Sequence, residues 1–171
     1  MKRIVLIRHA KSSWADDAQD DLDRPLNQRG RIAAPIIGTW LADHKLKPDF
    51  TWLSPATRCQ ETWERVSVEF GKKPEVQTHR ALYMADPKTT LEIIKLSDDE
   101  ADTVAVVGHQ PGIGATTRKL ADGKESETLS RAYRKFPTAG VAVLEADIKS
   151  WDKLKFGEAK FKHFVMPKEL I

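Results

Sequence analysis

The sequence of 171 residues lacks several features that would mark a particular class of protein. Its single cysteine, Cys59, cannot form an internal disulfide, which is typical of a reducing compartment. Apolar runs are short: residues 4–7 are too few for a signal peptide, and no stretch approaches the length of a membrane span. The net charge of +3 is small, whereas nucleic-acid binding usually leaves a strong basic patch. We therefore predict a soluble, cytoplasmic protein with no membrane or nucleic-acid partner.

The overall composition is that of an ordinary globular protein. Apolar residues make up 40% and charged residues 31% of the chain, which is enough apolar material for a substantial core. The sequence shows no repeat and no linker. These features predict a single domain that covers residues 1–171.

Strands are expected where short apolar runs occur. Residues 4–7 and 104–107 have no polar alternation, which is typical of strands buried on both faces of a parallel sheet. Further strands are expected at residues 50–53, 140–146 and 160–165, the last with the alternation of an edge strand.

Helices are expected between these strands. Asn27 is a plausible N-cap for the first, which contains Pro35 and should be kinked or delayed there. Ser54 is the expected cap of the next, with Pro55 in its first turn. Two more are expected at residues 89–96 and 111–120. The alternation predicts an α/β fold, a three-layer αβα sandwich with a mostly parallel sheet.

Basic side chains follow three of the expected strands. Arg8 and His9 end the first strand, Arg58 lies in the first turn of the helix after the second, and His109 follows the strand at 103–108. The carboxyl ends of parallel strands meet at one edge of a sheet, so these four side chains should converge. Two guanidiniums can hold a phosphoryl group, one imidazole can attack it, and the other can stabilise its oxygens. The pattern favours phosphoryl chemistry.

Three motifs in order resemble those of a known family. Leu6-Ile7-Arg8-His9-Ala10 looks like the Arg-His-Gly signature of the histidine phosphatase superfamily, which includes phosphoglycerate mutase relatives. The segments at residues 54–62 and 107–111 are similar to its second and third motifs. Residues 24–30 and 136–140 most resemble the small SixA-like phosphohistidine phosphatases. The resemblance implies a phosphoglycerate mutase-like fold.

The resemblance also implies a role for each matched residue. His9 would be the nucleophile that becomes phosphohistidine, Arg8 and Arg58 would bind the phosphate, and His109 would donate a hydrogen bond to it. No metal or organic cofactor is implied. Further substrate contacts are expected from the loop beyond His9. The candidates in that loop are Ser12 and Trp14.

The chain departs from the family pattern at three places, which are Ala10, Ala15 and the position of the general acid. Ala10 replaces the glycine of the signature, which requires a backbone conformation that alanine tolerates. Mutase-like members carry a glutamate general acid near residues 82–86, where this chain has Met84, and Asp86 is the remaining candidate acid. An alkoxide leaving group needs a proton, whereas the imidazole of phosphohistidine leaves with little help. The missing acid therefore favours a phosphohistidine substrate, or an activated ester, over sugar phosphates.

Three functions follow from these residues. The first is a phosphatase that hydrolyses phosphohistidine in a phosphorylated protein through a phosphohistidine intermediate on His9. The second is a small-molecule phosphomonoesterase with Asp86 as its acid. The third is a phosphate- or phosphoprotein-binding module with weak catalysis. Cys59 and Arg65 also have the spacing of cysteine phosphatases, but the residues between them should be helical, so we expect Cys59 to be a packing residue.

Overall fold

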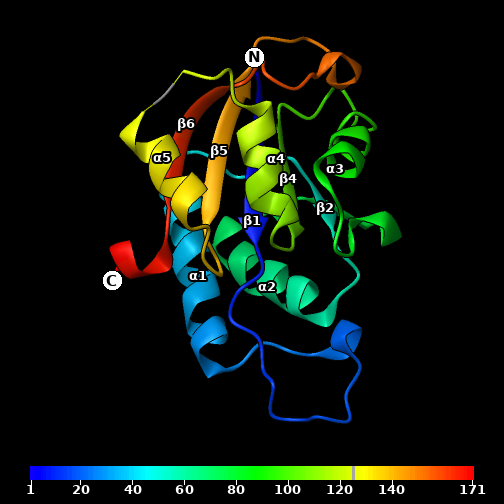
Figure 1. Ribbon diagram of the computed structural model, residues 1–171, viewed down its shortest axis with the longest axis vertical. Coiled ribbons are helices and arrows are strands. Elements are labelled where there is room, and N and C mark those ends of the chain that lie inside the picture. The colour runs from blue at the N-terminus through cyan, green and yellow to red at the C-terminus, as the bar shows by residue number, and fades with distance from the viewer. Residues whose placement is uncertain (125) are drawn as a thin grey trace.

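The computed structural model describes residues 1–124 and 126–171, which form a six-stranded sheet covered by helices on both faces (Figure 1). The strand order is β3-β2-β4-β1-β5-β6, in which β3, β2, β4 and β1 are mutually parallel and β5 runs antiparallel to both of its neighbours, β1 and β6. The strands are β1 (Lys2–Arg8), β2 (Phe50–Leu53), β3 (Glu75–Thr78), β4 (Thr103–Gly108), β5 (Val141–Ala146) and β6 (Lys160–Val165). The predicted α/β class with a mostly parallel sheet is confirmed.

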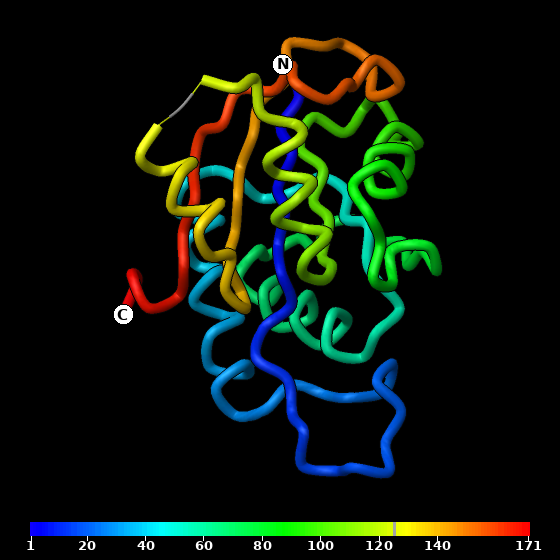
Figure 2. Tube along the Cα trace, in the orientation of Figure 1, coloured from blue at the N-terminus to red at the C-terminus, as the bar shows by residue number. Residues whose placement is uncertain are grey.

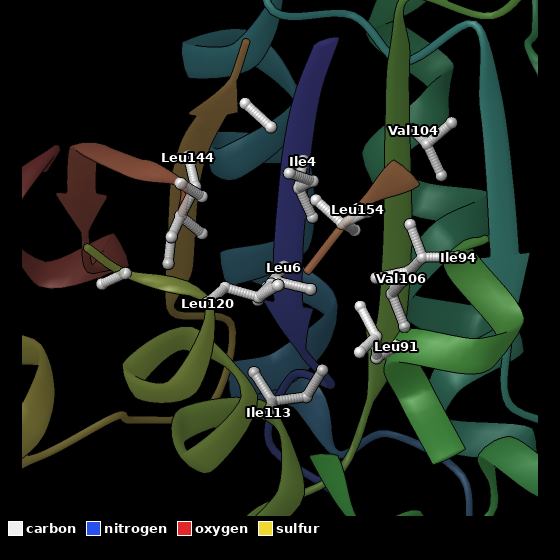
Figure 3. Packing of buried hydrophobic residues seen from close by; sticks show 14 of the residues in the cluster. Ile4, Leu6, Leu91, Ile94, Val104, Val106, Ile113, Leu120, Leu144 and Leu154 are labelled. Carbon is white, nitrogen blue, oxygen red and sulfur yellow. The ribbon is translucent and has the colours of Figure 1, made fainter. Parts of the chain in front are cut away.

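The helices divide between the two faces of the sheet. They are α1 (Gln28–Asp43), α2 (Thr57–Ser67), α3 (Pro87–Ile94), α4 (Gly112–Leu120) and α5 (Glu127–Arg134). Because successive strand side chains point to opposite faces, Val5 and Ile7 of β1 join the core with α1 and α2. Ile4 and Leu6 join the core with α3, α4 and α5, part of which is shown in Figure 3. Strand β1 therefore lies in the middle layer, with one core on each of its faces.

Helix α1 begins where the sequence predicts. The side chain of Asn27 caps it by accepting a hydrogen bond of 2.9 Å from the backbone N–H of Gly30. Pro35 lies within the helix. Gly38 allows α1 to approach α2 closely, since a Cβ there would lie 2.1 Å from the carbonyl oxygen of Val66. This contact fixes α2, the helix that carries Arg58.

One helix prediction is wrong, and one helix was not predicted. Ser54 does not cap α2, which begins at Thr57 with Ala56 at its N-cap position and no side-chain cap. The Ser54 hydroxyl instead accepts a hydrogen bond from the Ala56 N–H, a local turn that competes with helix capping. The sequence analysis also missed α5. This helix buries only Leu129 and Ala132, so it gives a weak apolar pattern.

Figure 2 shows where the connections lie relative to the sheet. The loop after β1, residues 9–27, extends beyond the carboxyl ends of the parallel strands. The connection between β5 and β6 lies at the opposite end. None of the helices in the described residues has the length and apolar character needed to cross a membrane.

Candidate active site

The four basic side chains predicted to converge lie together at the carboxyl edge of the parallel strands. Arg8 ends β1 and pairs in register with Gly108, the last residue of the adjacent strand β4. His9 and His109 follow these two positions, and their ring centroids are 5.5 Å apart. Arg58 comes from the first turn of α2, after β2, the strand on the other side of β4. The topology thus brings two imidazoles and two guanidiniums to one place.

His9 is held in one orientation by its own loop. Its Nδ1 lies 2.7 Å from the carbonyl oxygen of Ala10, which can only accept, so Nδ1 carries the proton and donates. The lone pair of the neutral ring is then on Nε2. Burial lowers the pKa of His9 to about 4, with further lowering by the nearby positive charges of Arg58 and Arg8. The ring is therefore neutral near pH 7.

Helix α2 supports the His9 loop through one hydroxyl. The fully buried Thr62 accepts a hydrogen bond of 2.9 Å from the N–H of Ala10 and donates one of 2.6 Å to the carbonyl of Arg58. Ala10 is buried and its φ is negative, so alanine is tolerated where the family signature has glycine. A single threonine therefore links the backbone at His9 to the backbone at Arg58.

His109 is the second buried imidazole. Burial first, and then the positive charge of Arg58, lower its pKa to about 3, so this ring is also neutral near pH 7. Its Nε2 lies 2.7 Å from the hydroxyl oxygen of Ser54, and its Nδ1 accepts from Arg58 Nη2 at 3.3 Å. The ring therefore contacts a hydroxyl on one side and a guanidinium on the other.

The two arginines are only partly satisfied. Arg8 donates from Nη1 to the carbonyl oxygen of Phe136 at 2.9 Å, in the segment before β5. The Nε atoms of both Arg8 and Arg58 are buried and have no hydrogen-bond partner among the described residues. Buried unpaired donors are rare in folded proteins because they are costly. An anion between these side chains would satisfy such donors.

Asp21 is a site residue that the sequence analysis did not single out. Arg58 donates to its carbonyl oxygen at 2.6 Å and to its carboxylate at 2.9 Å, and the Tyr83 hydroxyl also donates to this carboxylate. The pKa of Asp21 is lowered to about 2, first by the Tyr83 hydroxyl and then by hydrogen bonds from Arg24 and Arg58. Five aspartates occur at residues 16–23, and no local signal distinguishes Asp21 from the others.

Arg24 contributes a third guanidinium near the site, and its side chain is buried. It donates to the Ser12 hydroxyl at 2.8 Å and to the Ser13 carbonyl at 3.1 Å, and its charge also lowers the pKa of His9 and His109. Ser12 is thus engaged by Arg24. Trp14 is 71% exposed, and the Cζ atom of Arg24 lies 3.5 Å from the centroid of the Trp14 ring. The sequence signal available for Arg24 was its place in residues 24–30, the segment that resembles the SixA-like branch.

Asp86 is placed differently from the four central residues. It is the N-cap of α3, and its carboxylate accepts a hydrogen bond of 2.8 Å from the Thr89 N–H. That hydrogen bond lowers the pKa of Asp86, so the group is a carboxylate near pH 7. Met84, in the position expected for a family acid, is half exposed and has a left-handed φ of 52°. No strong general acid is provided by this segment.

Cys59 and the possible metal ligands of the chain are the last candidates for chemistry at the site. Cys59 lies inside α2, and burial raises the pKa of its thiol to about 12, so the nucleophilic thiolate is not formed near pH 7. Within residues 1–124 and 126–171, no three side chains of histidine, cysteine, aspartate or glutamate converge as the ligands of a metal would.

Comparisons with known proteins agree with this geometry. Residues 4–83 match the histidine phosphatase superfamily, branch 1. An uncharacterised protein of Mycobacterium leprae is 35% identical over 166 residues, covering 95% of this chain and all of that protein. The chain belongs to the histidine phosphatase superfamily.

Solved structures refine this assignment to a branch. A protein from Agrobacterium tumefaciens assigned as the phosphohistidine phosphatase SixA is 31% identical, with a TM-score of 0.81 over 97% of this chain and 98% of that one. Its counterpart from Nakamurella multipartitia is 29% identical, with a TM-score of 0.85 over 97% and 96% of the two chains. Within the superfamily, the chain falls in the SixA-like branch, and the predicted relationship is confirmed.

Proposed function

We propose that this protein hydrolyses phosphohistidine in a phosphorylated protein, through a phosphohistidine intermediate on His9. The observation that carries the proposal is the pair of neutral imidazoles, His9 and His109, beside two guanidiniums whose buried Nε–H groups have no partner in the part of the chain that the structure describes. A neutral imidazole is a nucleophile, and fixed cations neutralise the charge on a transferring phosphoryl group.

The reaction has two displacement steps. In the first, the lone pair of His9 Nε2 attacks phosphorus, the P–N bond to the substrate imidazole breaks, and the leaving imidazole takes up a proton from solvent. In the second, water attacks the phosphorus on His9, the P–Nε2 bond breaks, and inorganic phosphate leaves with the loss of a proton from the water. The hydrogen bond from Nδ1 to Ala10 keeps Nε2 as the reacting nitrogen in both steps.

His109 can donate a hydrogen bond to the phosphoryl group if its proton moves from one ring nitrogen to the other. While Arg58 donates to Nδ1, the proton of the neutral His109 ring is on Nε2, toward Ser54. If a phosphoryl group takes over the Arg58 donor, Nδ1 can carry the proton and donate to the phosphoryl oxygen. The Ser54 hydroxyl, which already accepts from the Ala56 N–H, can then donate to Nε2. Ser54 thus supports either tautomer.

The segment at residues 84–86 favours a phosphohistidine substrate over a phosphate ester whose leaving group is a strongly basic alkoxide. An ester oxygen leaves as a strong base and needs a general acid, whereas an imidazole is a better leaving group. Asp86 is exposed, ionised near pH 7 and engaged as a helix cap, and Met84 cannot donate a proton. Residues 84–86 therefore supply no general acid, and the hydrolysis of a P–N bond does not depend on one.

A turnover comparison tests the proposal. Wild type and His9→Ala are assayed, without added metal, on a protein phosphorylated on histidine with phosphoramidate and on p-nitrophenyl phosphate. We expect faster turnover of phosphohistidine than of the ester, lost in His9→Ala while its circular dichroism spectrum is unchanged. Asp86→Asn serves as a control and should leave phosphohistidine turnover intact.

Other outcomes of this assay would identify the alternatives. A preference for the ester would make the protein a small-molecule phosphomonoesterase. No turnover of either substrate, with inorganic phosphate still bound, would make it a phosphate-binding module. Each of these results contradicts the proposed phosphohistidine hydrolysis.

A further inference from the structure

A groove of about 510 Å³ lies beside the candidate active site. One wall is the first half of α1, with Ile32 and Ile36, and the other is formed by residues 135–138 and the C-terminal residues from Met166 onward. The C-terminal 3-10 helix, Pro167–Glu169, follows β6 and lies beside α1 (Figure 2). The groove is therefore built from three segments that are distant in sequence.

Every charged side chain that lines this groove is a cation. Besides Arg8 at its inner end, these are Lys11, Arg29, Lys135 and Lys168. None of these four has a carboxylate within ion-pair distance in the described part of the chain. Such unneutralised cations around one concave surface favour an acidic occupant.

The groove also exposes apolar side chains. Ile32 is 58% exposed although α1 buries its other face against the sheet, and Ile36 and Met166 contribute further apolar surface. A free phosphate or another small anion would leave this surface in water. A polypeptide with both acidic and apolar side chains would cover it, because such segments combine apolar anchors with a charged rim.

The groove is continuous with the phosphoryl site through Arg8. The Arg8 side chain lines its inner end and donates to the carbonyl oxygen of Phe136, next to the groove residues Lys135 and Pro137. A chain whose phosphorylated side chain reaches His9 would therefore have its neighbouring residues at the groove.

We propose that this groove docks an acidic segment, also bearing apolar side chains, that flanks the phosphorylated histidine of the substrate protein. The inference rests on the proposed function and extends it from the reacting group to the surrounding polypeptide. Selectivity for a protein would then come from contacts made outside the phosphoryl site.

Two phosphohistidine peptides of equal length test the proposal. In one, glutamate and leucine residues flank the phosphohistidine, and in the other, lysine and serine residues do. We expect kcat/KM of the intact wild-type chain to be about tenfold higher for the acidic peptide, as a few exposed charge pairs would give. Ile32→Ser should reduce this preference through lost apolar contact.

Charge reversal locates the effect in the groove. Arg29→Glu/Lys168→Glu should raise KM for the acidic peptide about tenfold while kcat changes little, since both residues lie outside the reacting centre. The matched control, Lys149→Glu/Lys155→Glu, makes the same change of charge in the loop between β5 and β6, at the other end of the sheet (Figure 1). The control should keep the preference, and both double variants should turn over p-nitrophenyl phosphate within about twofold of wild type.

The outcomes separate this inference from the proposed function. Equal turnover of the two peptides, or equal loss in the two double variants, would overturn the groove as a docking site and leave phosphohistidine hydrolysis standing. Absence of His9-dependent turnover of both peptides would overturn both. If Arg29→Glu/Lys168→Glu abolished binding to phosphatidylserine vesicles and the wild type showed no peptide preference, the groove would face a membrane, against the proposal.

Discussion

The two histidines of the site stay neutral because of burial and of the positive charges around them. His9 and His109 are both buried, and the cations around them, Arg58 above all, oppose a further positive charge. Both effects lower a histidine pKa. The same cations that would bind a phosphoryl group thus keep its nucleophile unprotonated.

The protonation state of His9 can be measured directly. Its pKa of about 4 predicts that the ring stays neutral from pH 5 to 8, with the proton on Nδ1. Nitrogen-15 NMR of the histidine rings should show this tautomer for His9, with no titration in that range. A midpoint near the ordinary value of 6.5 for His9 would contradict the environment described here.

Ser54 should act through His109. In Ser54→Ala the imidazole loses the hydroxyl at Nε2, worth about 1–1.5 kcal/mol for a hydrogen bond, so kcat should fall about five- to tenfold with little change in KM. Steady-state kinetics on the phosphohistidine protein check this. Ser67→Ala removes a buried hydroxyl at the other end of α2 and is the matched control. A rise in KM at constant kcat would assign Ser54 to binding instead.

At the scale of the element, α2 does more than supply Arg58. Its Thr62 hydroxyl bonds the Ala10 backbone beyond β1, so the helix also positions the loop of His9. The packing of α1 on α2 at Gly38 holds the helix in place. His9, the proposed nucleophile, and Arg58, which we propose binds the phosphate, are therefore both positioned by α2.

Replacing Thr62 with valine tests this link. Thr62→Val keeps the shape but leaves the buried Ala10 N–H unpaired, which should reduce the free energy of unfolding by about 1–3 kcal/mol. Turnover should fall as well, because the His9 loop loses its anchor. Urea unfolding and kcat measure the two effects. A variant with wild-type turnover would show that the His9 loop does not need this anchor.

The sequence predicted those elements whose signals are local. The buried runs at β1 and β4 and the Asn27 cap are local patterns, and each was found as expected. Helix α5 was missed because its two buried residues give little periodicity. The bond between Ser54 and His109 joins residues 55 positions apart, so a local capping rule misassigned Ser54. Asp21 likewise depends on a loop that folds back onto Arg58.

For the whole molecule, the direction of the strands decides where chemistry can occur. β2, β4 and β1 are adjacent and parallel, so the residues after them gather at one edge. This is why His9, Arg58 and His109 could be predicted to converge from their positions after strands. The cationic groove beside this edge could not, since it combines α1 with the end of the chain.

The buried histidines should also make global stability depend on pH. Below about pH 6.5 an unfolded histidine binds a proton, but folded His9 and His109 bind none until the pH nears about 4 and about 3. The unfolded state then binds more protons, so stability falls as the pH drops from 7 to 5, by on the order of 1–2 kcal/mol for each histidine. The lowered pKa of His163 acts in the same direction.

Urea unfolding at pH 7 and pH 5 measures this dependence. In His109→Asn the difference between the two pH values should shrink, because one of the contributing groups is gone. Asp21, with a pKa of about 2, contributes stability that is lost only in stronger acid, below this window. Equal stability at the two pH values in the wild type would contradict the neutral, buried state of both histidines.

The most direct test of the account is to trap the phosphorylated enzyme. The protein is mixed with a phosphohistidine substrate carrying phosphorus-32, quenched in alkali within one turnover, and mapped by peptide mass spectrometry. The account predicts an alkali-stable, acid-labile phosphoryl group on Nε2 of His9, absent from His9→Ala. Release of inorganic phosphate at the wild-type rate with no label on the protein, or label on another residue, would contradict the role given to His9.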